Sequence, residues 1–212
     1  YIKMASEGRY KEALKLIKDF NPFPAVCGSI CNRRCGQECT RGLVDAPLAI
    51  DEIKKFIAER ELNEEERYIP LCENVEGGFY TNKMAIIGAG PAGMSAAYYL
   101  RMKGYPVTIF EKEEKPGGML RYGIPSFRLD KAIIDAEIDV LKKMGIHFNC
   151  GVEIGKDITI DDLRKQGYEA IYIAIGAQGG KKLDVPGMDE DYVMTGIDFL
   201  REVNHYEKED YL

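Results

Sequence analysis

Long hydrophobic runs, an N-terminal leader and an excess of basic residues are all missing from this sequence. No apolar segment reaches the roughly 18 residues of a transmembrane helix, so no membrane insertion is expected. The start, Tyr1 to Met4, has neither the basic nor the apolar part of a signal peptide. With 29 Lys and Arg against 35 Asp and Glu, the net charge is -6. A protein that binds nucleic acid by neutralising phosphates needs a basic face, so no nucleic-acid partner is expected.

The composition is that of an ordinary globular protein. The 212 residues are 45% hydrophobic and 30% charged, which indicates one or two domains with a substantial core. Tyr1 stands where an initiating methionine is expected, so we interpret the chain as a fragment of a longer one. Of the six cysteines, four lie within thirteen residues. Disulfide frameworks belong to short, core-poor secreted chains, so the cysteines favour a reducing, cytoplasmic setting.

The residues from 1 to 80 predict a helical, cysteine-rich domain. A first helix is expected to end before Pro22, because four apolar residues repeat at helical spacing: Tyr10, Ala13, Leu14 and Ile17. A second amphipathic helix is expected over 47–60, with Pro47 in its first turn. Its apolar side is formed by Ile50, Ile53, Phe56 and Ile57. Residues 61–81 are interpreted as a connection between domains.

The residues from 82 to 212 predict a second domain of the α/β class. Strands are expected over 84–87, 107–110 and 170–174, and helices over 94–103 and 129–144. A strand, a glycine-rich turn, a helix and a second strand within about 30 residues form a parallel crossover unit. The predicted fold is therefore an N-terminal all-α domain followed by a partial Rossmann-like domain with a parallel sheet.

A glycine fingerprint lies between the first predicted strand and its helix. Gly88-Ala-Gly-Pro-Ala-Gly93 matches G-x-G-x-x-G, and Glu111 ends the next strand. Gly88 permits a sharp turn, Gly90 lets the backbone approach a pyrophosphate, and Gly93 lets the helix pack on the strand. Glu111 would accept hydrogen bonds from ribose hydroxyls and would repel a 2′-phosphate, so FAD or NAD is favoured over NADP. A glycine-rich turn without a ligand is the alternative.

Further candidates follow the fingerprint along the chain. The glycine pair at 117–118 would let a second loop approach the cofactor, and Arg128 could reach a phosphate oxygen or remain solvated. The predicted strand over 170–174 ends at Ala174 and is followed closely by Gly176, and a glycine there would let the backbone pack against a cofactor. The predicted cofactor-binding residues are Gly88, Gly90, Pro91, Ala92, Gly93, Glu111, Lys112, Gly118, Met119, Leu120, Arg128, Val152, Ala174 and Gly176.

The four clustered cysteines form a second signal, with three residues between successive members: Cys27, Cys31, Cys35 and Cys39. On one continuous helix twelve residues rise about 18 Å, so these thiolates could not converge on one cluster. Either the segment is turned, or the cysteines are divided between two iron–sulfur clusters. Zinc is the alternative metal, although zinc sites more often use paired C-x2-C knuckles. Cys72 and Cys150 are interpreted as small buried hydrophobes.

The motifs taken together resemble a known family. Gly88–Gly93, Glu111-Lys112, 117–125, 127–129 and 174–177 are similar to the small (β) subunit of NADPH-dependent glutamate synthase. Related members are the flavin subunits of bifurcating ferredoxin:NADP oxidoreductases and the N-terminal half of dihydropyrimidine dehydrogenase. The resemblance implies FAD, [4Fe–4S] clusters on the cysteines, NADPH bound in a separate domain, and a larger synthase or oxidoreductase subunit as electron acceptor.

The resemblance also implies roles for single residues. These are pyrophosphate contact by Gly88 to Gly93, ribose contact by Glu111, flavin-side contact by Gly118 and Met119, phosphate contact by Arg128 and a backbone contact to adenine near Val152. Two family features are absent: a cysteine group upstream of Cys27, and a second nucleotide fingerprint after Gly196. The number of clusters and the NADPH site are therefore left open.

Three functions are weighed on this basis. The first is an electron-transfer module that passes electrons from NADPH through FAD to [4Fe–4S] clusters and a partner subunit. The second is a flavin and iron–sulfur binding fragment without activity of its own. The third is an NAD-dependent dehydrogenase with a zinc-binding cap. No catalytic side chain is expected because the cofactors carry the chemistry, and we interpret His147 and His205 as surface or packing residues.

Overall fold

The computed structural model describes residues 1–212 except 63, 65, 71–79, 182, 189 and 207–212. Its N-terminal part is helical, with α1 Ile2–Ser6, α2 Tyr10–Phe20, α3 Pro24–Ile30, α4 Arg34–Gln37, the 3-10 helix η1 Thr40–Leu43 and α5 Ile50–Leu62. The remainder contains β1 Lys83–Ile87, α6 Pro91–Met102, β2 Val107–Glu111, α7 Met119–Tyr122, α8 Lys131–Lys143, β3 His147–Cys150, α9 Ile160–Lys165, β4 Tyr168–Ile173 and α10 Gly196–Tyr206. Nothing in these described ranges is a helix of the length and apolarity needed to cross a membrane.

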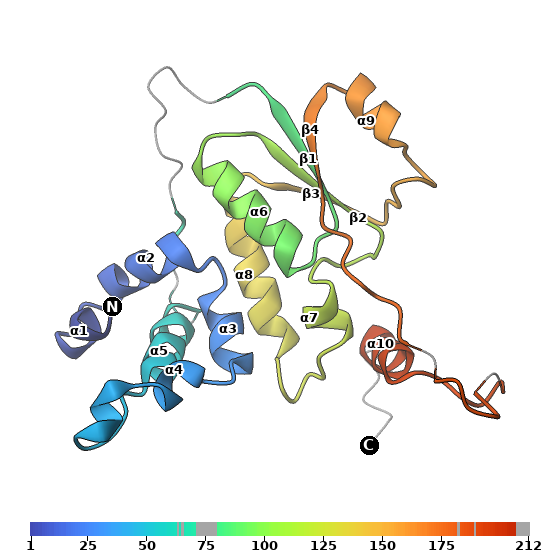
Figure 1. Ribbon diagram of the computed structural model, residues 1–212. Coiled ribbons are helices and arrows are strands. Elements are labelled where there is room, and N and C mark those ends of the chain that lie inside the picture. The colour runs from blue at the N-terminus through green and yellow to red at the C-terminus, as the bar shows by residue number, and fades with distance from the viewer. Residues whose placement is uncertain (63, 65, 71–79, 182, 189, 207–212) are drawn as a thin grey trace.

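The second part is built on a parallel four-stranded sheet of order β3-β2-β1-β4. Side chains of successive strand residues point to opposite faces, and this sheet follows that rule. Ile86 and Ile109 are buried with residues of α6 and α8, whereas Ala85 and Phe110 are buried with Leu163 of α9. Figure 1 shows α6 and α8 together on one side of the sheet. The predicted α/β class with an N-terminal helical part is confirmed.

The N-terminal helices have a small core of their own. Ala13, Leu14 and Ile17 of α2 are buried against Ile57 of α5, as the helical spacing predicted. The predicted helix over 47–60 instead begins at Ile50, because its first helical hydrogen bond runs from the Ile53 N–H to the Ala49 carbonyl oxygen. Pro47 therefore lies outside the helix. Phe56, expected on the apolar side, is half exposed and packs edge-on against Tyr10.

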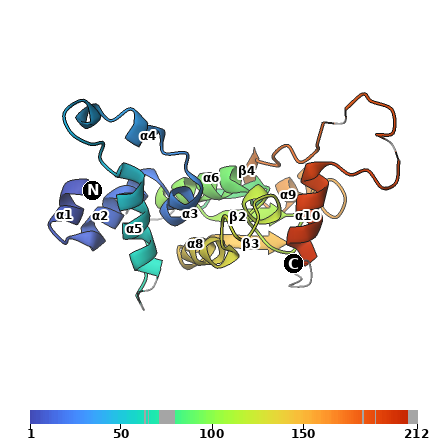
Figure 2. The ribbon, with the colours of Figure 1, turned by 90° about the horizontal axis from the view of Figure 1, so that it is seen from below.

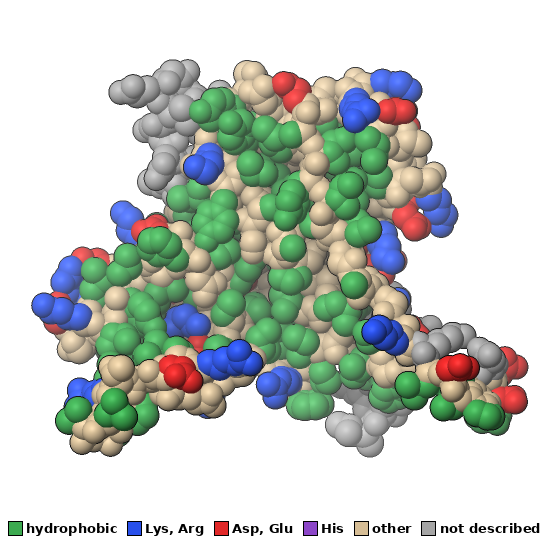
Figure 3. All heavy atoms as spheres, viewed as in Figure 1, with side chains coloured by type: hydrophobic (Ala, Val, Ile, Leu, Met, Phe, Trp, Pro, Cys, Tyr) green, Lys and Arg blue, Asp and Glu red, His purple; other side chains and the backbone are tan. Residues whose placement is uncertain are grey.

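The two parts also share a core. Phe23 and Val26, which lie at and within α3, are buried in the same cluster as Ile134 and Ile138 of α8. In Figure 2 the helical group lies beside the sheet and α3 lies nearest to it. In the space-filling view, hydrophobic side chains cover much of the centre of one face, and charged side chains gather at its margins (Figure 3). The division into domains at residues 80 and 82 stays a prediction.

Candidate functional site

The glycine loop is shaped by contacts that leave no room for larger residues. Gly88 has φ +106°, and a Cβ there would lie 2.4 Å from the Ala174 carbonyl oxygen. A Cβ on Gly93 would lie 2.0 Å from the Gly88 carbonyl oxygen, so the first turn of α6 packs directly under the loop. Any other residue at Gly93 would therefore force helix and loop apart.

A second glycine loop meets the first. A Cβ on Gly118, whose φ is +52°, would lie 2.8 Å from the Gly90 Cα, and the Gly117 N–H donates to the Ala89 carbonyl oxygen at 2.9 Å. Gly90 is less crowded, since the nearest neighbour of a Cβ there would be the Gly118 Cα, 4.0 Å away. The two loops thus touch backbone to backbone and leave one wall free of side chains.

A cavity of about 570 Å³ opens at this meeting point, within the size range of cofactor sites. It lies at the carboxyl ends of the parallel strands, where α/β proteins bind ligands. Of the predicted cofactor-binding residues, the following line it: Gly88, Gly90, Pro91, Ala92, Glu111, Lys112, Gly118, Met119, Val152, Ala174 and Gly176. Six lining residues were not predicted: Ile87, Phe110, Glu153, Ile154, Ile175 and Gln178. Four of these six adjoin predicted site residues in sequence, whereas Ile154 and Gln178 do not.

The N-terminus of α6 faces this cavity. Gly90 is the N-cap residue and provides no side-chain cap for the backbone N–H groups of the first turn. Pro91, which lacks an N–H, stands at the first helical position. The uncapped amides and the positive end of the helix dipole form an environment that favours an anionic group such as a pyrophosphate. The fit to a dinucleotide thus rests on backbone geometry.

Glu111 also lines the cavity, at the end of β2 and next to the glycine loop. Its side chain is 8% exposed, and its carboxylate accepts hydrogen bonds from the N–H of Ala89 at 2.6 Å and of Glu113 at 3.0 Å. These bonds hold the carboxylate at the cavity and brace the glycine loop. An ionised carboxylate has about four acceptor positions, so acceptor capacity is left for a ribose hydroxyl.

Three predicted cofactor residues do not line the cavity. Gly93 lies beneath the loop, where it permits the helix packing described above. Leu120 is buried in the main core beside α8, because α7 turns its side chain inward. Arg128 is exposed and is not a lining residue, and its predicted phosphate contact stays a prediction. The N–H of Val152 already donates to the Glu111 carbonyl oxygen at 2.9 Å, which leaves only its carbonyl for a contact to adenine.

The cysteine segment is turned, which was one of the two expected arrangements. Cys27 lies in α3, Cys31 ends that helix, Cys35 lies in α4 and Cys39 precedes η1. Arg33, at the turn between α3 and α4, has the left-handed φ of 58°, which is unusual for a residue with a side chain. Cys35 is exposed and the other three are half-buried.

Cysteine thiolates are suitable ligands for iron, but these four do not lie close enough together to share one cluster. Among the described residues, no three His, Cys, Asp or Glu side chains are grouped closely enough to hold a metal ion. The Cys27 thiol donates to the Asn21 Oδ1 at 3.6 Å, and burial raises its pKa. Backbone N–H groups, that of Leu48 first, hold the pKa of Cys39 below its usual value. The four residues would therefore have to move toward one another to share a cluster.

The remaining predicted residues are placed as follows. Cys150, expected to be buried, is half-buried at the end of β3, and burial raises its pKa. His147 is exposed on the same strand. Cys72 and the side chain of His205 lie outside the described residues. Neither Cys150 nor His147 lines the cavity at the sheet.

Comparison with known proteins gives matches over both parts of the chain. The profile described as dihydropyrimidine dehydrogenase domain II, 4Fe-4S cluster, matches residues 1–66. The profile of the pyridine nucleotide-disulphide oxidoreductases matches residues 82–211.

Curated relatives match nearly the whole chain. It is 40% identical to the NADP(+)-dependent formate dehydrogenase subunit beta of Moorella thermoacetica, over 96% of this chain and 31% of that protein. It is 37% identical to the glutamate synthase [NADPH] small chain of Bacillus subtilis, over 91% of this chain and 38% of that protein. The chain therefore spans about a third of the length of these relatives.

Among solved structures, Mycobacterium tuberculosis FprA in complex with NADPH superimposes with a TM-score of 0.54 and 25% identity. The match covers 61% of this chain and 31% of that one. The resemblance inferred from the sequence motifs is confirmed by these comparisons.

Proposed function

The chain belongs to the pyridine nucleotide-disulphide oxidoreductase family, and from this premise we propose that it is a module of an NAD(P)H-dependent flavin and iron–sulfur oxidoreductase. In this proposal the cavity at the sheet binds FAD, and the cysteine segment contributes ligands to [4Fe–4S] clusters. The observation that supports it most is the cavity itself, where the backbone of Gly90 and Gly118 forms one wall and the buried Glu111 carboxylate is bonded to the adjoining glycine loop. Bound flavin would supply the exchange between two-electron hydride and single electrons.

The chain's own residues bind and orient the cofactor in this proposal. The first-turn N–H groups of α6 would donate hydrogen bonds to the pyrophosphate, because they are uncapped and lie at the positive end of the helix dipole. Glu111 keeps the loop in place through the Ala89 N–H and would accept a hydrogen bond from the adenosine ribose. Gly118 and Met119, which line the cavity, would contact the flavin side of the cofactor.

The proposal also names an electron donor and an electron acceptor. NADPH is favoured as donor, because two relatives have names that specify NADP(+) or NADPH. Those relatives are named as a beta subunit and a small chain, which supports a larger partner subunit as the acceptor. A role like that of the glutamate synthase small chain, in the cytoplasm, fits both the sequence motifs and the identity of 37%.

A second candidate is that these 212 residues bind FAD without turnover of their own. Ile173 and Ile175, at the end of β4 beside the cavity, are 60% and 62% exposed. Active sites that transfer hydride usually exclude water. The exposed edge supports binding without efficient turnover until another protein surface covers it.

Flavin titration of the full chain tests the proposal. Glu111→Gln retains an oxygen that can accept from the Ala89 N–H but loses the charge, so we expect FAD affinity to fall about fivefold to tenfold. Asp161→Asn, which removes an exposed carboxylate on α9, is the control and should leave affinity unchanged. A chain that binds no FAD would contradict the proposal, and a colourless protein containing zinc would favour the NAD-dependent dehydrogenase with a zinc-binding cap.

Reduction by NADPH separates the two candidates. FAD bound in these 212 residues and bleached by added NADPH would support the electron-transfer module. FAD that is bound but not reduced would support the binding role. FAD that is reduced only after a partner subunit is added would indicate that the partner provides the NADPH site. The absorbance of the bound flavin is the measurement in each case.

A further inference from the structure

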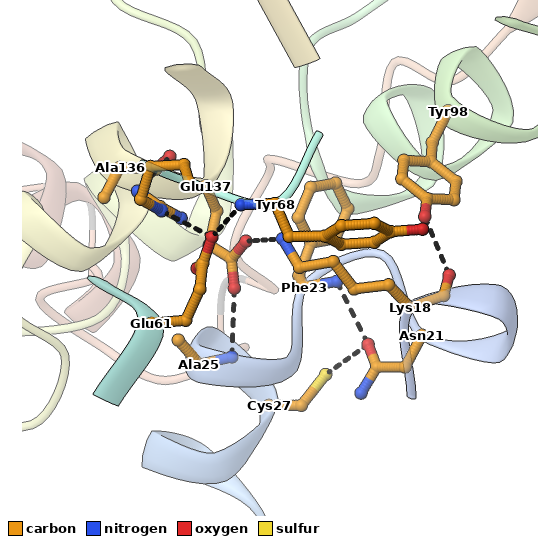
Figure 4. A network of polar contacts seen from close by, with 11 residues as sticks. Lys18, Asn21, Phe23, Ala25, Cys27, Glu61, Tyr68, Tyr98, Ala136 and Glu137 are labelled. Atoms are coloured by element: carbon orange, nitrogen blue, oxygen red, sulfur yellow. Dashed lines mark hydrogen bonds and ion pairs between the residues drawn. The ribbon is translucent and has the colours of Figure 1, made fainter. Parts of the chain in front are cut away.

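Glu137 on α8 is a buried carboxylate that joins three helices. Its side chain is 2% exposed, its Oε2 lies 3.3 Å from the Lys18 Nζ of α2, and its Oε1 accepts a hydrogen bond from the Ala25 N–H of α3 at 3.0 Å. Figure 4 shows Lys18 and Ala25 approaching the two oxygens from different directions. Burying a carboxylate costs free energy. Here the ion pair of Oε2 with Lys18 and the hydrogen bond from Ala25 to Oε1 offset that cost.

The contact to Ala25 serves as a cap for α3. Phe23, the N-cap residue of α3, provides no side-chain hydrogen bond, so the helix lacks a cap within its own segment. Ala25 stands in the first turn, where backbone N–H groups have no helical partner. Glu137 therefore supplies from α8 the acceptor that a Ser, Thr or Asp normally supplies from the N-cap position. The helix so held carries Cys27.

The neighbouring contacts strengthen this junction. Lys18 is 1% exposed, and its backbone carbonyl accepts a hydrogen bond from the Tyr98 hydroxyl of α6 at 2.8 Å. The Asn21 Oδ1 accepts from both the Phe23 N–H and the Cys27 thiol (Figure 4). The start of α3 and the direction of the Cys27 side chain are thus fixed on both sides.

Other side chains of α8 hold the loop that lines the cavity. Asp135 is paired with Arg121, which is 3% exposed and whose Nε donates to the Pro116 carbonyl oxygen at 2.7 Å. The Lys131 Nζ donates to carbonyl oxygens of the segment 120–124. The loop between residues 116 and 124 contains Gly118 and Met119 of the cavity wall. One helix therefore contacts both the cavity loop and the helix of Cys27.

We propose that Glu137 is a positioning residue that fixes the cysteine-bearing helix α3 to the helix that braces the cofactor cavity. It acts through the Ala25 N–H and thereby sets the separation between Cys27 and the cavity. The importance of that separation for electron transfer rests on the proposed function. The positioning itself does not, because every contact in it lies between residues of this chain.

Two double variants of the full chain isolate the hydrogen bond from the charges. Lys18→Met with Glu137→Leu removes both buried charges and the acceptor for Ala25. Lys18→Met with Glu137→Gln removes the same charges but keeps an acceptor. Neither variant leaves an unpaired buried charge, which is the usual reason that such substitutions unfold a protein. Asp139→Leu with Lys143→Met, an exposed pair on the same helix, is the control.

The measurement is amide hydrogen exchange of residues 25–31, with β1 and α6 as references. We expect exchange in α3 to be about fivefold to tenfold faster in the leucine variant than in the glutamine variant, as for loss of a helix cap. The references and the control should not change. Equal exchange of α3 in both variants would show that Glu137 only neutralises Lys18 and would overturn the proposal.

Two further outcomes are distinguishable. Faster exchange over α3, β1 and α6 alike in the leucine variant, with a lower Tm, would also overturn it, since Glu137 would then stabilise the whole molecule. FAD titration of the same preparations tests the proposed function independently. Absence of FAD binding in the unsubstituted chain would contradict that function while the comparison of α3 exchange still stands or fails by itself.

Discussion

The cavity at the sheet and the cysteine segment differ in what builds them. The cavity is formed largely by backbone, since two glycine loops meet at Gly90 and Gly118. The cysteine segment offers four thiols, but the described residues do not bring three metal-binding side chains together. Backbone geometry can be fixed by the local sequence, whereas thiolates that repel one another are often gathered only by the metal. One site is thus preformed and the other depends on its ligand.

The largest expected effect would break the preformed site. In Gly93→Ala the new Cβ would meet the Gly88 carbonyl oxygen at 2.0 Å, a contact that only a movement of α6 or of the loop can relieve. We expect a loss of about 3 kcal/mol in the free energy of unfolding, because overpacking against backbone is poorly relieved. FAD binding should also be lost. Urea unfolding and flavin titration measure the two effects.

Gly179→Ala is the matched control for this prediction. A Cβ at Gly179 would meet nothing within 4 Å, so stability and FAD binding should stay close to those of the unsubstituted chain. If Gly93→Ala bound FAD as well as Gly179→Ala does, the close packing of loop and helix would not be what forms the site.

A smaller effect is expected where the ligand has to organise the site. When the reduced chain is loaded anaerobically with iron and sulfide, amide protection should rise over residues 27–48 and stay constant over β1 and α6. Cys35→Ser should lower the bound iron by about half or more, because thiolates are the ligands of such clusters. It should leave the unloaded fold unchanged, since Cys35 is exposed.

Cys150→Ser is the control for iron binding. Cys150 lies at the end of β3, outside the segment of 27–48, so its substitution should leave the iron content unchanged. Equal iron content in the Cys35→Ser and Cys150→Ser proteins would argue that the clustered cysteines are not the ligands. Iron content is measured against protein concentration after removal of unbound metal.

Features set by local sequence could be predicted, whereas features that depend on tertiary packing could not. The strand–glycine loop–helix unit and Glu111 follow from local pattern, and the structure places most of those residues around one cavity. The helix α6 begins three residues before the predicted start at residue 94, because Pro91 suits the first helical turn. Arg128 could not be placed, since its position depends on how the segment after α7 packs.

Tertiary contacts account for the larger omissions. The helix α3 was not predicted, and its first turn is capped by Glu137, which is 112 residues away from Ala25 in the sequence. No local pattern contains that partner. The helix α9 was also missed, although Thr159 and Asp162 form a capping box that the sequence does display. The first omission was unavoidable, whereas the second was not.

The smallest expected effect concerns α9, whose first turn is capped with the help of a titrating side chain, Asp162. A hydrogen bond from the Thr159 hydroxyl holds the pKa of Asp162 below its usual value of 3.8. A carboxyl whose pKa is lowered by folding stabilises the protein above its usual pKa, and this contribution is lost as the pH falls through the lowered value.

We therefore expect Asp162→Asn to lower the Tm by a few degrees at most at neutral pH, and the difference from the unsubstituted chain to shrink as the pH is lowered toward 3. Thermal unfolding followed by circular dichroism between pH 7 and about pH 3 measures it. Asp161→Asn makes the same charge change on the same turn without the bond to Thr159, so its Tm difference should vary less with pH. Parallel pH profiles for the two variants would mean that net charge, and not the capping box, stabilises this end of the sheet domain.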